Sequence, residues 1–420
     1  MRNCTLRSFA AAGSVLLALV AATGCSGKGA RPSSSTTSQG AGGGWSAGTN
    51  KIKVGLIAPL TGPFAILGQS QQNSLRVEID RVNAAGGVGG AQLELVARDS
   101  ALDPAKAVQA TQELATDPSV RLVVGPSLTA FWDAAKKTLD TNKKLNCQPG
   151  VAGGSFADQK YAFRGQDSYE ADARANLGWL RRQGVTSIAT VYEQDDTGKS
   201  LDTALKRLAP EYGLQYRGAQ FTRPDDQTHL PYVNNVRDAG ALWISSNVPG
   251  GPKSLAAIKE AGYTGKVVSG SGLQNIGFLE ASEDAANGAV FADMYYPFPG
   301  RTDPAGWQPG YRAHTDLVVQ RYGRNTGQRA VGATSPKGVA MAADCVFAYT
   351  TAAGQARSVD PDAVAAAWSR LDVPADRTPS GNRIAVTPAH EMYRPEDVRL
   401  YRWNKDAQGW YTTDVTEDQK

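Results

Sequence analysis

From residue 52 onward, short apolar runs of strand-forming residues alternate with segments of helical periodicity, and this alternation restricts the fold more than any other feature. Residues 52–57 read Ile-Lys-Val-Gly-Leu-Ile and predict a strand. Residues 70–85 carry apolar side chains at helical spacing until Gly86 and Gly87 end the helix. Strands separated by helices form parallel sheets with helices on both faces. The sequence therefore predicts an α/β fold.

The alternation occurs in two successive runs, which predict two α/β units. Three helical segments and a stretch rich in β-formers follow the second run, and these helices could return to the first unit. The expected strands are 52–57, 93–96, 121–124 and 147–152 in the first unit and 187–192, 241–245, 266–269 and 288–296 in the second; the later helices are 309–323, 335–353 and 361–371, and the β-rich stretch is 383–413.

The N-terminus reads as an export signal. Arg2 and Arg7 precede an apolar run at residues 9–22. A run of about 14 residues is too short to span a bilayer but suits the apolar region of a signal peptide. The run ends in Ala-Thr-Gly before Cys25, which resembles a bacterial lipoprotein cleavage site. We expect residues 1–24 to be a signal peptide and the Cys25 thiol to be lipidated.

The next segment reads as a tether. Residues 26–49 are mostly Ser, Gly, Thr and Ala, a composition that cannot bury a core. Residues 25–50 are therefore expected to be the lipidated cysteine and a flexible linker. No later apolar run reaches the ~18 residues of a membrane span. The predicted location is extracytoplasmic, with a folded body anchored to the outer face of the cell membrane.

The charge balance excludes one class of function. The 44 Lys and Arg residues against 40 Asp and Glu give a formal net charge of +4. Proteins that track nucleic-acid phosphates need a clustered basic excess, so we expect no nucleic-acid partner. Three His residues without ligand spacing predict neither a metal site nor a cofactor. His314 is predicted on a solvated helix face and His229 in a loop, while Trp132 could line a ligand site or a helix surface.

The loops after the predicted strands share one character: they are small, hydroxyl-bearing and rich in glycine. In parallel α/β sheets, ligands bind beyond the carboxyl ends of the strands, where backbone N–H groups and Ser or Thr hydroxyls can hold a carboxylate or another small polar group. Six such loops on two units predict a shared binding site. They are residues 61–68, 126–129, 152–155, 193–198, 247–251 and 270–275.

An enzyme is the main alternative. Residues 124–129 resemble the Gly-x-Ser-x-Gly nucleophile turn of α/β-hydrolases, with Ser127 as the nucleophile. Thr129 stands where that motif has its last glycine, and the triad would have to recruit His390. We expect no catalysis, and keep the Ser127 hydrolase as the alternative.

Several segments, taken in order, are similar to the Leu/Ile/Val-binding family, the type I periplasmic substrate-binding proteins of ABC importers. The family resemblance implies two lobes joined by three crossovers at a hinge, which close on a small ligand and deliver it to an ABC permease. The implied lobes are 51–165 plus 296–388 and 166–295 plus 389–420, with crossovers near 164–167, 293–297 and 386–395. The matching segments are 52–65, 83–90, 103–108, 123–126 and 161–164.

The resemblance also implies ligand-binding residues. In the first lobe, Ser127, Thr129 and the backbone of residues 152–155 match positions that bind a ligand carboxylate, and Leu67 stands where an aromatic residue is frequent. The residues so assigned are Leu67, Ser127, Thr129, Ala152, Gly153 and Ser155.

In the second lobe, Thr197 stands before the glycine of the loop that packs on the ligand. Asn247 and Ser271 stand where the family has an aromatic residue and the acid that pairs with the ligand's ammonium. A buried ammonium needs a partner, so these departures argue against a Leu, Ile or Val ligand bound as a zwitterion. Asp195 or Asp196 could supply the missing charge, unless they cap the next helix. The expected ligand is a small polar or carboxylate molecule, and an amino-acid-like compound, an amide, a carboxylic acid and a nucleobase-like molecule all stay open.

The sequence also bears on the pairing of its cysteines and on its partners. Cys147 and Cys345 remain when Cys4 is removed with the signal peptide and Cys25 is lipidated. In an oxidising compartment they could form a disulfide, and the family topology returns the helix at 335–353 to the first lobe. We expect a monomer that partners with a permease. The same fold also serves as a ligand-sensing module for a signalling partner, which stays open as another alternative.

Overall fold

The computed structural model describes residues 44–62, 65–150, 153–274, 276–295, 297, 304–323 and 336–418. The predicted signal peptide, Cys25 and Ala152 lie outside the described residues, as does the side chain of Asp196.

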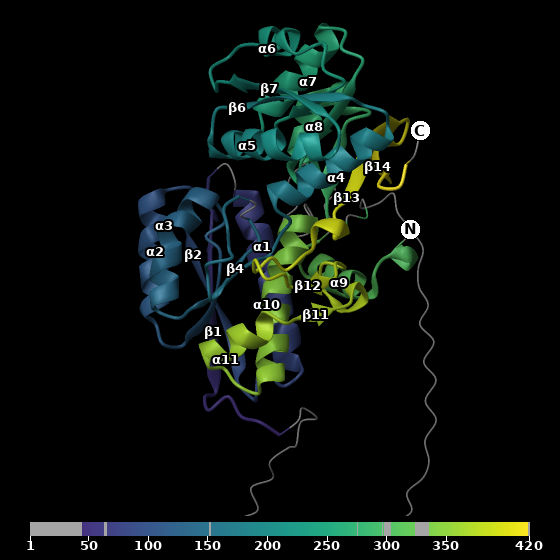
Figure 1. Cartoon of the computed structure of the whole chain (residues 1–420). Coiled ribbons are helices and arrows are strands. Elements are labelled where there is room, and N and C mark those ends of the chain that lie inside the picture. The colour runs from purple at the N-terminus through teal and green to yellow at the C-terminus, as the bar shows by residue number, and fades with distance from the viewer. Residues whose placement is uncertain are drawn as a thin grey trace, which may run out of the picture. The chain divides into compact units, whose positions relative to one another are not determined.

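The first sheet has five parallel strands in the order β2-β1-β3-β4-β5, and Figure 1 shows α2 and α3 on one side of it. Its inner strand β1 is buried along nearly its whole length, as expected for a parallel strand covered on both faces. Asp103 caps α2 by accepting a 2.7 Å hydrogen bond from the N–H of Ala105, with proline at the first helical position. The elements are β1 (Lys51–Ala58), α1 (Ala65–Ala84), β2 (Gln92–Asp99), α2 (Pro104–Thr116), β3 (Val120–Val124), α3 (Thr129–Thr141), β4 (Leu145–Gln148) and β5 (Ala162–Arg164).

The second sheet has seven strands in the order β14-β13-β10-β9-β8-β6-β7. Strands β6 to β10 pair in parallel, whereas β13 and β14 add an antiparallel hairpin beside β10. The elements are α4 (Tyr169–Arg182), β6 (Ser187–Glu193), α5 (Asp196–Glu211), β7 (Gln215–Thr222), α6 (Leu230–Asn235), β8 (Ala241–Ile244), α7 (Gly250–Glu260), β9 (Lys266–Ser269), α8 (Ile276–Ser282), β10 (Val290–Asp293), β13 (Arg399–Asp406) and β14 (Gly409–Asp414).

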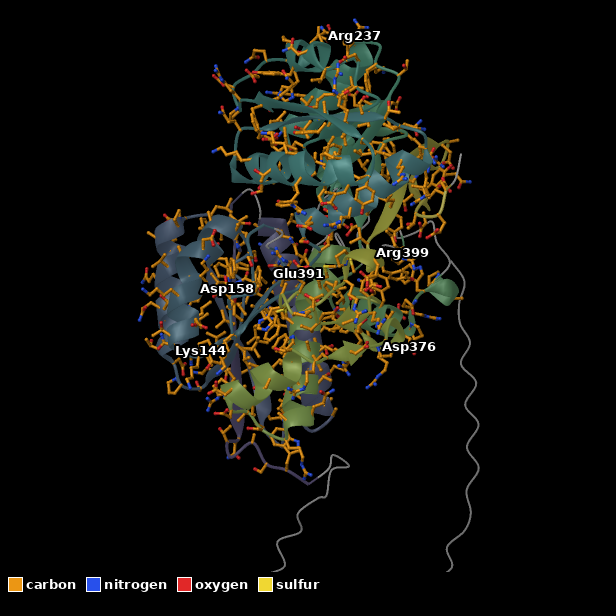
Figure 2. All side chains as sticks on the ribbon, in the orientation of Figure 1. Lys144, Asp158, Arg237, Asp376, Glu391 and Arg399 are labelled. Carbon is orange, nitrogen blue, oxygen red and sulfur yellow. A yellow bond between two sulfur atoms is a disulfide. The ribbon has the colours of Figure 1, made fainter. Side chains whose placement is uncertain are left out.

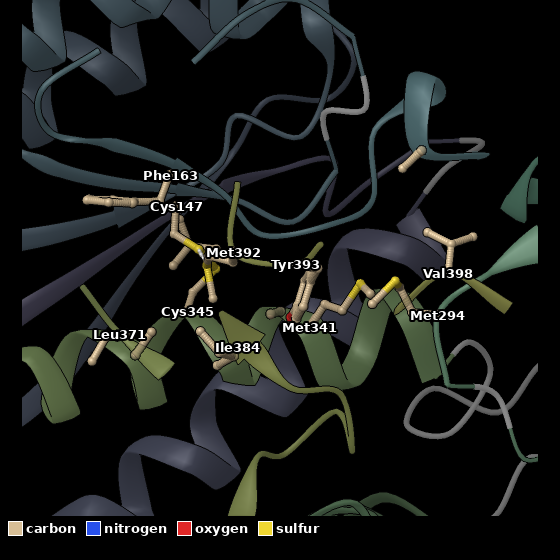
Figure 3. Packing of buried hydrophobic residues seen from close by; sticks show 14 of the residues in the cluster. Cys147, Phe163, Met294, Met341, Cys345, Leu371, Ile384, Met392, Tyr393 and Val398 are labelled. Atoms are coloured by element: carbon tan, nitrogen blue, oxygen red, sulfur yellow. Dashed lines mark hydrogen bonds between the residues drawn. A yellow bond between two sulfur atoms is a disulfide. The ribbon is translucent and has the colours of Figure 1, made fainter. Parts of the chain in front are cut away.

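Three later helices pack against the first sheet and its helix α1. Figure 1 shows α10 beside α1, and the two helices are in extensive contact. Trp368 stacks on Phe163 of β5 with ring centroids 4.7 Å apart, and the Sγ atoms of Cys147 and Cys345 are bonded, which joins β4 to α10 (Figure 3). The elements are α9 (Pro309–Tyr322), α10 (Pro336–Ala356), α11 (Pro361–Trp368) and the small pair β11 (Asp372–Val373) and β12 (Ile384–Ala385).

Three strands, β5, β7 and the two-residue β11, were not expected, and one expected strand ends early. Strand β7 lies at an edge of the second sheet and is only partly buried, so its sequence lacks the apolar run that marks the inner strands. Strand β5 has only three residues. The strand expected at 147–152 instead ends at Gln148, because Pro149 has no N–H for the ladder.

The end of the predicted tether is held against the body. The Ala47 N–H donates to the Gly89 carbonyl at 2.9 Å, and Arg357 donates to the Gly44 carbonyl at 3.2 Å. The half-buried Trp45 packs on the core of the first sheet, and a Cβ on Gly89 would lie 2.7 Å from its ring. The tether was predicted to run to residue 50, but the structure fixes residues 44–50, because Trp45 supplies apolar surface within an otherwise polar segment. We call residues 44–50 the N-terminal strap.

Two histidines are buried, and one of them was predicted to be solvated. His314 is buried between α9 and α1, where its Nε2 lies 2.8 Å from the Ser74 hydroxyl. Burial lowers the pKa of His314 to about 3, so the ring is neutral. His229 is also buried, with Nδ1 2.9 Å from the Ser254 hydroxyl. His229 lies in the loop before α6, as predicted. The prediction of a solvated position for His314 was wrong, because helical spacing alone does not tell which polar residues face a second layer.

Candidate functional site

The loops that follow the first sheet's strands meet at the carboxyl edge. Thr129 is the first residue of α3, directly after the loop that leaves β3. A Cβ built on Gly153, in the loop after β4, would lie 3.5 Å from both the Oγ1 and Cγ2 atoms of Thr129. The structure therefore brings together two of the predicted ligand-binding residues, and Gly153 leaves space beside the threonine hydroxyl.

Tyr169, the first residue of α4, extends this group toward the second sheet. The same Cβ position on Gly153 lies 3.8 Å from Cε2 of Tyr169, and the Tyr169 hydroxyl lies 3.4 Å from Oγ1 of Thr197. Thr197 belongs to α5, which follows β6 of the second sheet. We call Thr129, Gly153, Tyr169 and Thr197 the hinge-side cluster.

Sequence reasoning missed Tyr169. The residue follows Ser168, whose hydroxyl accepts a 3.2 Å hydrogen bond from the Ala171 N–H and caps α4. A residue next to an N-cap reads as an ordinary helix start. The signal that could have found Tyr169 was its position in the sequence, because a tyrosine directly after the expected crossover at 164–167 stands close to both sheets.

The Ser127 hydroxyl is bonded to α1 rather than to a residue of this cluster. Its buried hydroxyl donates to Oε1 of Gln71 on α1 at 3.0 Å. The ring nitrogens of His390 lie 3.1 Å from the Ala162 carbonyl and 3.3 Å from the Ser369 hydroxyl. Both ends of the proposed serine–histidine pair thus have other partners, and the structure does not support Ser127 as a hydrolase nucleophile.

The acidic residues in the loops of the second sheet contact the N-termini of helices. Asp195 accepts a 2.7 Å hydrogen bond from the Gly198 N–H and caps α5, which is the capping role weighed in the sequence analysis. Glu193, at the end of β6, is half-buried, and burial raises the pKa of its carboxyl. Its Oε1 lies so close to Gly250 that a Cβ there would be 1.9 Å away, so this carboxylate packs on the start of α7.

The remaining predicted residues lie on the loops or helix starts at the carboxyl ends of the strands. Asn247 is exposed, with its N–H bonded to the Ser245 hydroxyl at 3.0 Å. A Cβ on Gly272, next to the half-buried Ser271, would lie 2.3 Å from the Ser246 hydroxyl, so the loops after β8 and β9 touch. Leu67 is half-buried on α1, and Ser155 is exposed, with its hydroxyl accepting from the Ala157 N–H at 3.3 Å.

Some exposed apolar side chains stand at the strand ends. Ile66, Leu128 and Val248 are 37%, 38% and 48% exposed, and each lies near the start of the helix that follows β1, β3 or β8. Val108 on α2 and Leu317 on α9 are similarly exposed, as single apolar residues often are. Leu128 adjoins Thr129 of the hinge-side cluster. The strand ends thus offer hydroxyls, amides and apolar contacts together.

A family model described as "Periplasmic binding protein" matches residues 51–408. The chain belongs to this family. It is similar to the leucine-, isoleucine-, valine-, threonine- and alanine-binding protein of Pseudomonas aeruginosa, with 24% identity over 369 residues that cover 86% of this chain and 92% of the relative. The resemblance to the Leu/Ile/Val-binding family is thereby confirmed.

Solved structures show the same fold. The type 1 periplasmic binding protein from Bordetella pertussis has a TM-score of 0.72 at 15% identity, covering 87% of this chain and 100% of that chain. A branched-chain amino acid transporter substrate binding protein from Streptococcus pneumoniae, in complex with isoleucine, has a TM-score of 0.67 at 17% identity, covering 87% and 99%. The predicted two-sheet α/β fold of a type I periplasmic binding protein is confirmed.

This periplasmic binding protein also contains a serine–histidine–acid arrangement that could be mistaken for an active site. Ser74 contacts His314, whose Nδ1 lies 3.8 Å from Oε2 of Glu78. All three side chains are buried between α1 and α9, where a substrate cannot reach them. Among the described residues, no group of three His, Cys, Asp or Glu side chains could hold a metal ion, and no helix is long and apolar enough to cross a membrane.

Proposed function

We propose that this periplasmic binding protein captures a small amino-acid-like or amide-like carboxylate that also carries an apolar group, and delivers it to an ABC permease. The observation that carries the proposal is the hinge-side cluster, in which Thr129 and Gly153 of the first sheet's loops lie next to Tyr169 and Thr197 at the start of the second sheet's helices. Hydroxyls and glycine amides suit a carboxylate, and the exposed Leu128, which adjoins Thr129, suits an apolar group.

The names of similar proteins support this ligand class. The Pseudomonas aeruginosa relative is named for binding leucine, isoleucine, valine, threonine and alanine, and the Streptococcus pneumoniae structure holds isoleucine. Ligand capture by closure of two lobes shifts an equilibrium between open and closed forms, so no chemical step is required.

The ligand experiment is a thermal-shift screen of the secreted chain, followed by calorimetry. The panel contains those five amino acids, their amides and short-chain carboxylic acids. At 100-fold excess over Kd, binding should stabilise the folded state by about 2.7 kcal/mol. A panel without any ligand that raises the melting temperature would refute this ligand class.

We further propose that Cys25 carries the lipid anchor. The support is the small residues before Cys25 and the polar composition that follows it. Expression of the full chain with a radiolabelled fatty acid should label the wild type and leave Cys25→Ser unlabelled. Equal labelling of both would refute the anchor without bearing on ligand binding.

A further inference from the structure

Arg164, the last residue of β5, is a buried charge that the proposed ligand site does not yet explain. The residue is 1% exposed. The chain between β4 and β5 contains the predicted ligand-binding residues Gly153 and Ser155, and Arg164 lies at the end of the strand that follows this loop. Burying a guanidinium costs several kcal/mol unless it is paired and hydrogen-bonded, so its partners must be part of a built arrangement.

The Arg164 guanidinium donates to two backbone carbonyls of the loop between β4 and β5. One terminal nitrogen donates to the Gly153 carbonyl at 3.0 Å, and the other donates to the Gly154 carbonyl at 2.6 Å. In a planar trans peptide, the N–H of the next residue points opposite to the carbonyl. The N–H groups of Gly154 and Ser155 therefore point away from Arg164, and the cation polarises both peptide units so that these groups become stronger donors.

Aromatic rings hold the loop from the same side. The guanidinium carbon lies 4.5 Å from the ring centre of Phe156, just after the loop glycines. Phe156 stacks on Trp132 of α3 with ring centroids 4.0 Å apart and an interplanar angle of 10°. Because α3 begins at Thr129, the loop and that helix are fixed together behind the hinge-side cluster.

Arg164 also belongs to a junction of two distant chain segments. The backbone N–H of Arg164 donates to the His390 carbonyl at 2.8 Å. The backbone carbonyl of Arg164 accepts from the Met392 N–H at 3.0 Å. Its Nε lies 3.3 Å from Oε1 of Glu391, which is labelled in Figure 2 and lies between β12 and β13. Burial raises the pKa of the Glu391 carboxyl, and interactions with Arg164 and Ser168 oppose that rise. Ser168 caps α4, the helix that precedes the second sheet.

We propose that Arg164 is a positioning residue that fixes the loop at residues 153–156 to the junction of residues 164 and 390–392, and so aims the amides of Gly154 and Ser155 as donors for a ligand's anionic end. The inference rests on the proposed function for its ligand, and on the contacts of Arg164 described above for its mechanism. Lysine cannot replace the arginine, because one ammonium cannot bond both carbonyls, pair with Glu391 and stack on Phe156 at once.

The first test uses hydrogen exchange in the ligand-free chain, so it does not depend on any ligand. Arg164→Lys should speed amide exchange at least tenfold in peptides covering residues 153–162, and leave β1 and β3 unchanged. The matched control is Arg383→Lys, an exposed arginine paired with Asp372 on the β11–β12 pair. Unchanged exchange at residues 153–162 would overturn the proposal.

A second measurement, on the wild type, tests the proposal even if Arg164→Lys does not fold. In the wild type under mild denaturant, the amides of residues 153–158 should open together with those of Arg164 and Met392, as one cooperative unit. Independent, faster opening of the loop would overturn the proposal. If L-leucine binds the wild type, Arg164→Lys should also lower the affinity for L-leucine about tenfold. If L-leucine does not bind, the exchange results still decide the role of Arg164.

Discussion

The hydroxyl of Tyr393 donates to Oδ2 of Asp344 across 2.7 Å, deep between α10 and the segment that leads to β13. The N–H and the hydroxyl of Ser380 bond to the same carboxyl. Burial is the main reason that the pKa of Asp344 is raised, to about 7, and the buried Glu78 on α1 adds to the rise. The core of the first sheet's helical layer therefore holds a carboxylic acid that keeps its proton up to about pH 7, beside Tyr393, which is labelled in Figure 3.

This carboxyl makes stability depend on pH in a predictable direction. The folded chain keeps the Asp344 proton up to about pH 7, whereas the unfolded chain releases it near its ordinary pKa of 3.8. Between these values the unfolded state binds fewer protons, so the free energy of unfolding falls as pH rises. Asp344→Asn has no proton to lose. Urea unfolding at pH 4.5 and pH 8 should show the variant gaining stability relative to the wild type at the higher pH.

The control for this prediction is Asp372→Asn. Asp372 is exposed, and its hydrogen bond from Arg383 lowers the pKa of the carboxyl. A lowered pKa gives stability that is present above the unfolded pKa and lost below it, so this variant should change in the opposite direction, and by little. A difference between Asp344→Asn and the wild type that does not change with pH would contradict the assignment.

The disulfide should contribute to stability through the length of chain that it closes. Cys147 and Cys345 are 198 residues apart in sequence. Removal of a disulfide that closes a long loop costs about 2–5 kcal/mol, mostly through the freedom of the unfolded chain. Cys345→Ser should lower the free energy of unfolding by that amount, and a reductant should lower the wild type to the same level. Two free thiols in non-reducing peptide maps would contradict the bond.

Thr129→Val tests the first-sheet side of the ligand site. The substitution keeps the shape of the half-buried side chain and removes the hydroxyl beside Gly153. A carboxylate ligand left without this donor should bind about 1–3 kcal/mol more weakly, measured by calorimetry. Thr138→Val, at the other end of α3, is the matched control and should bind as the wild type does. Unchanged affinity would remove Thr129 from the site.

Tyr169→Phe tests the second-sheet side. The variant keeps the ring near Gly153 and loses the hydroxyl that contacts Thr197. We expect a loss of ligand affinity of about 0.5–1.5 kcal/mol, and a larger loss for Tyr169→Ala. Tyr263→Phe removes a hydroxyl bonded to the Ala239 carbonyl at 2.8 Å, elsewhere in the second unit, and serves as control. Equal affinities for all three variants and the wild type would exclude Tyr169 from ligand contact.

The sequence predicted strands well where burial on both faces requires a run of apolar residues, as in β1. It predicted them less well where a strand is short or lies at a sheet edge, as in β5 and β7. At the site, the loops were predicted because glycine and hydroxyl residues follow each strand. The direction of a side chain is a tertiary property, so the inward bond of Ser127 and the position of Tyr169 could not be read from spacing.

The N-terminal strap determines where a mechanical load enters the body. Trp45 and Ala47 contact the turn before β2, at the amino edge of the first sheet, and β1 then runs about 26 Å before it reaches the loops at the opposite edge. A pull on the preceding chain is therefore borne by the ring of Trp45 and the bonds of Gly44 and Ala47. The loops that surround Thr129 and Gly153 lie at the opposite edge of this sheet, so a force applied at residue 44 would not act on them directly.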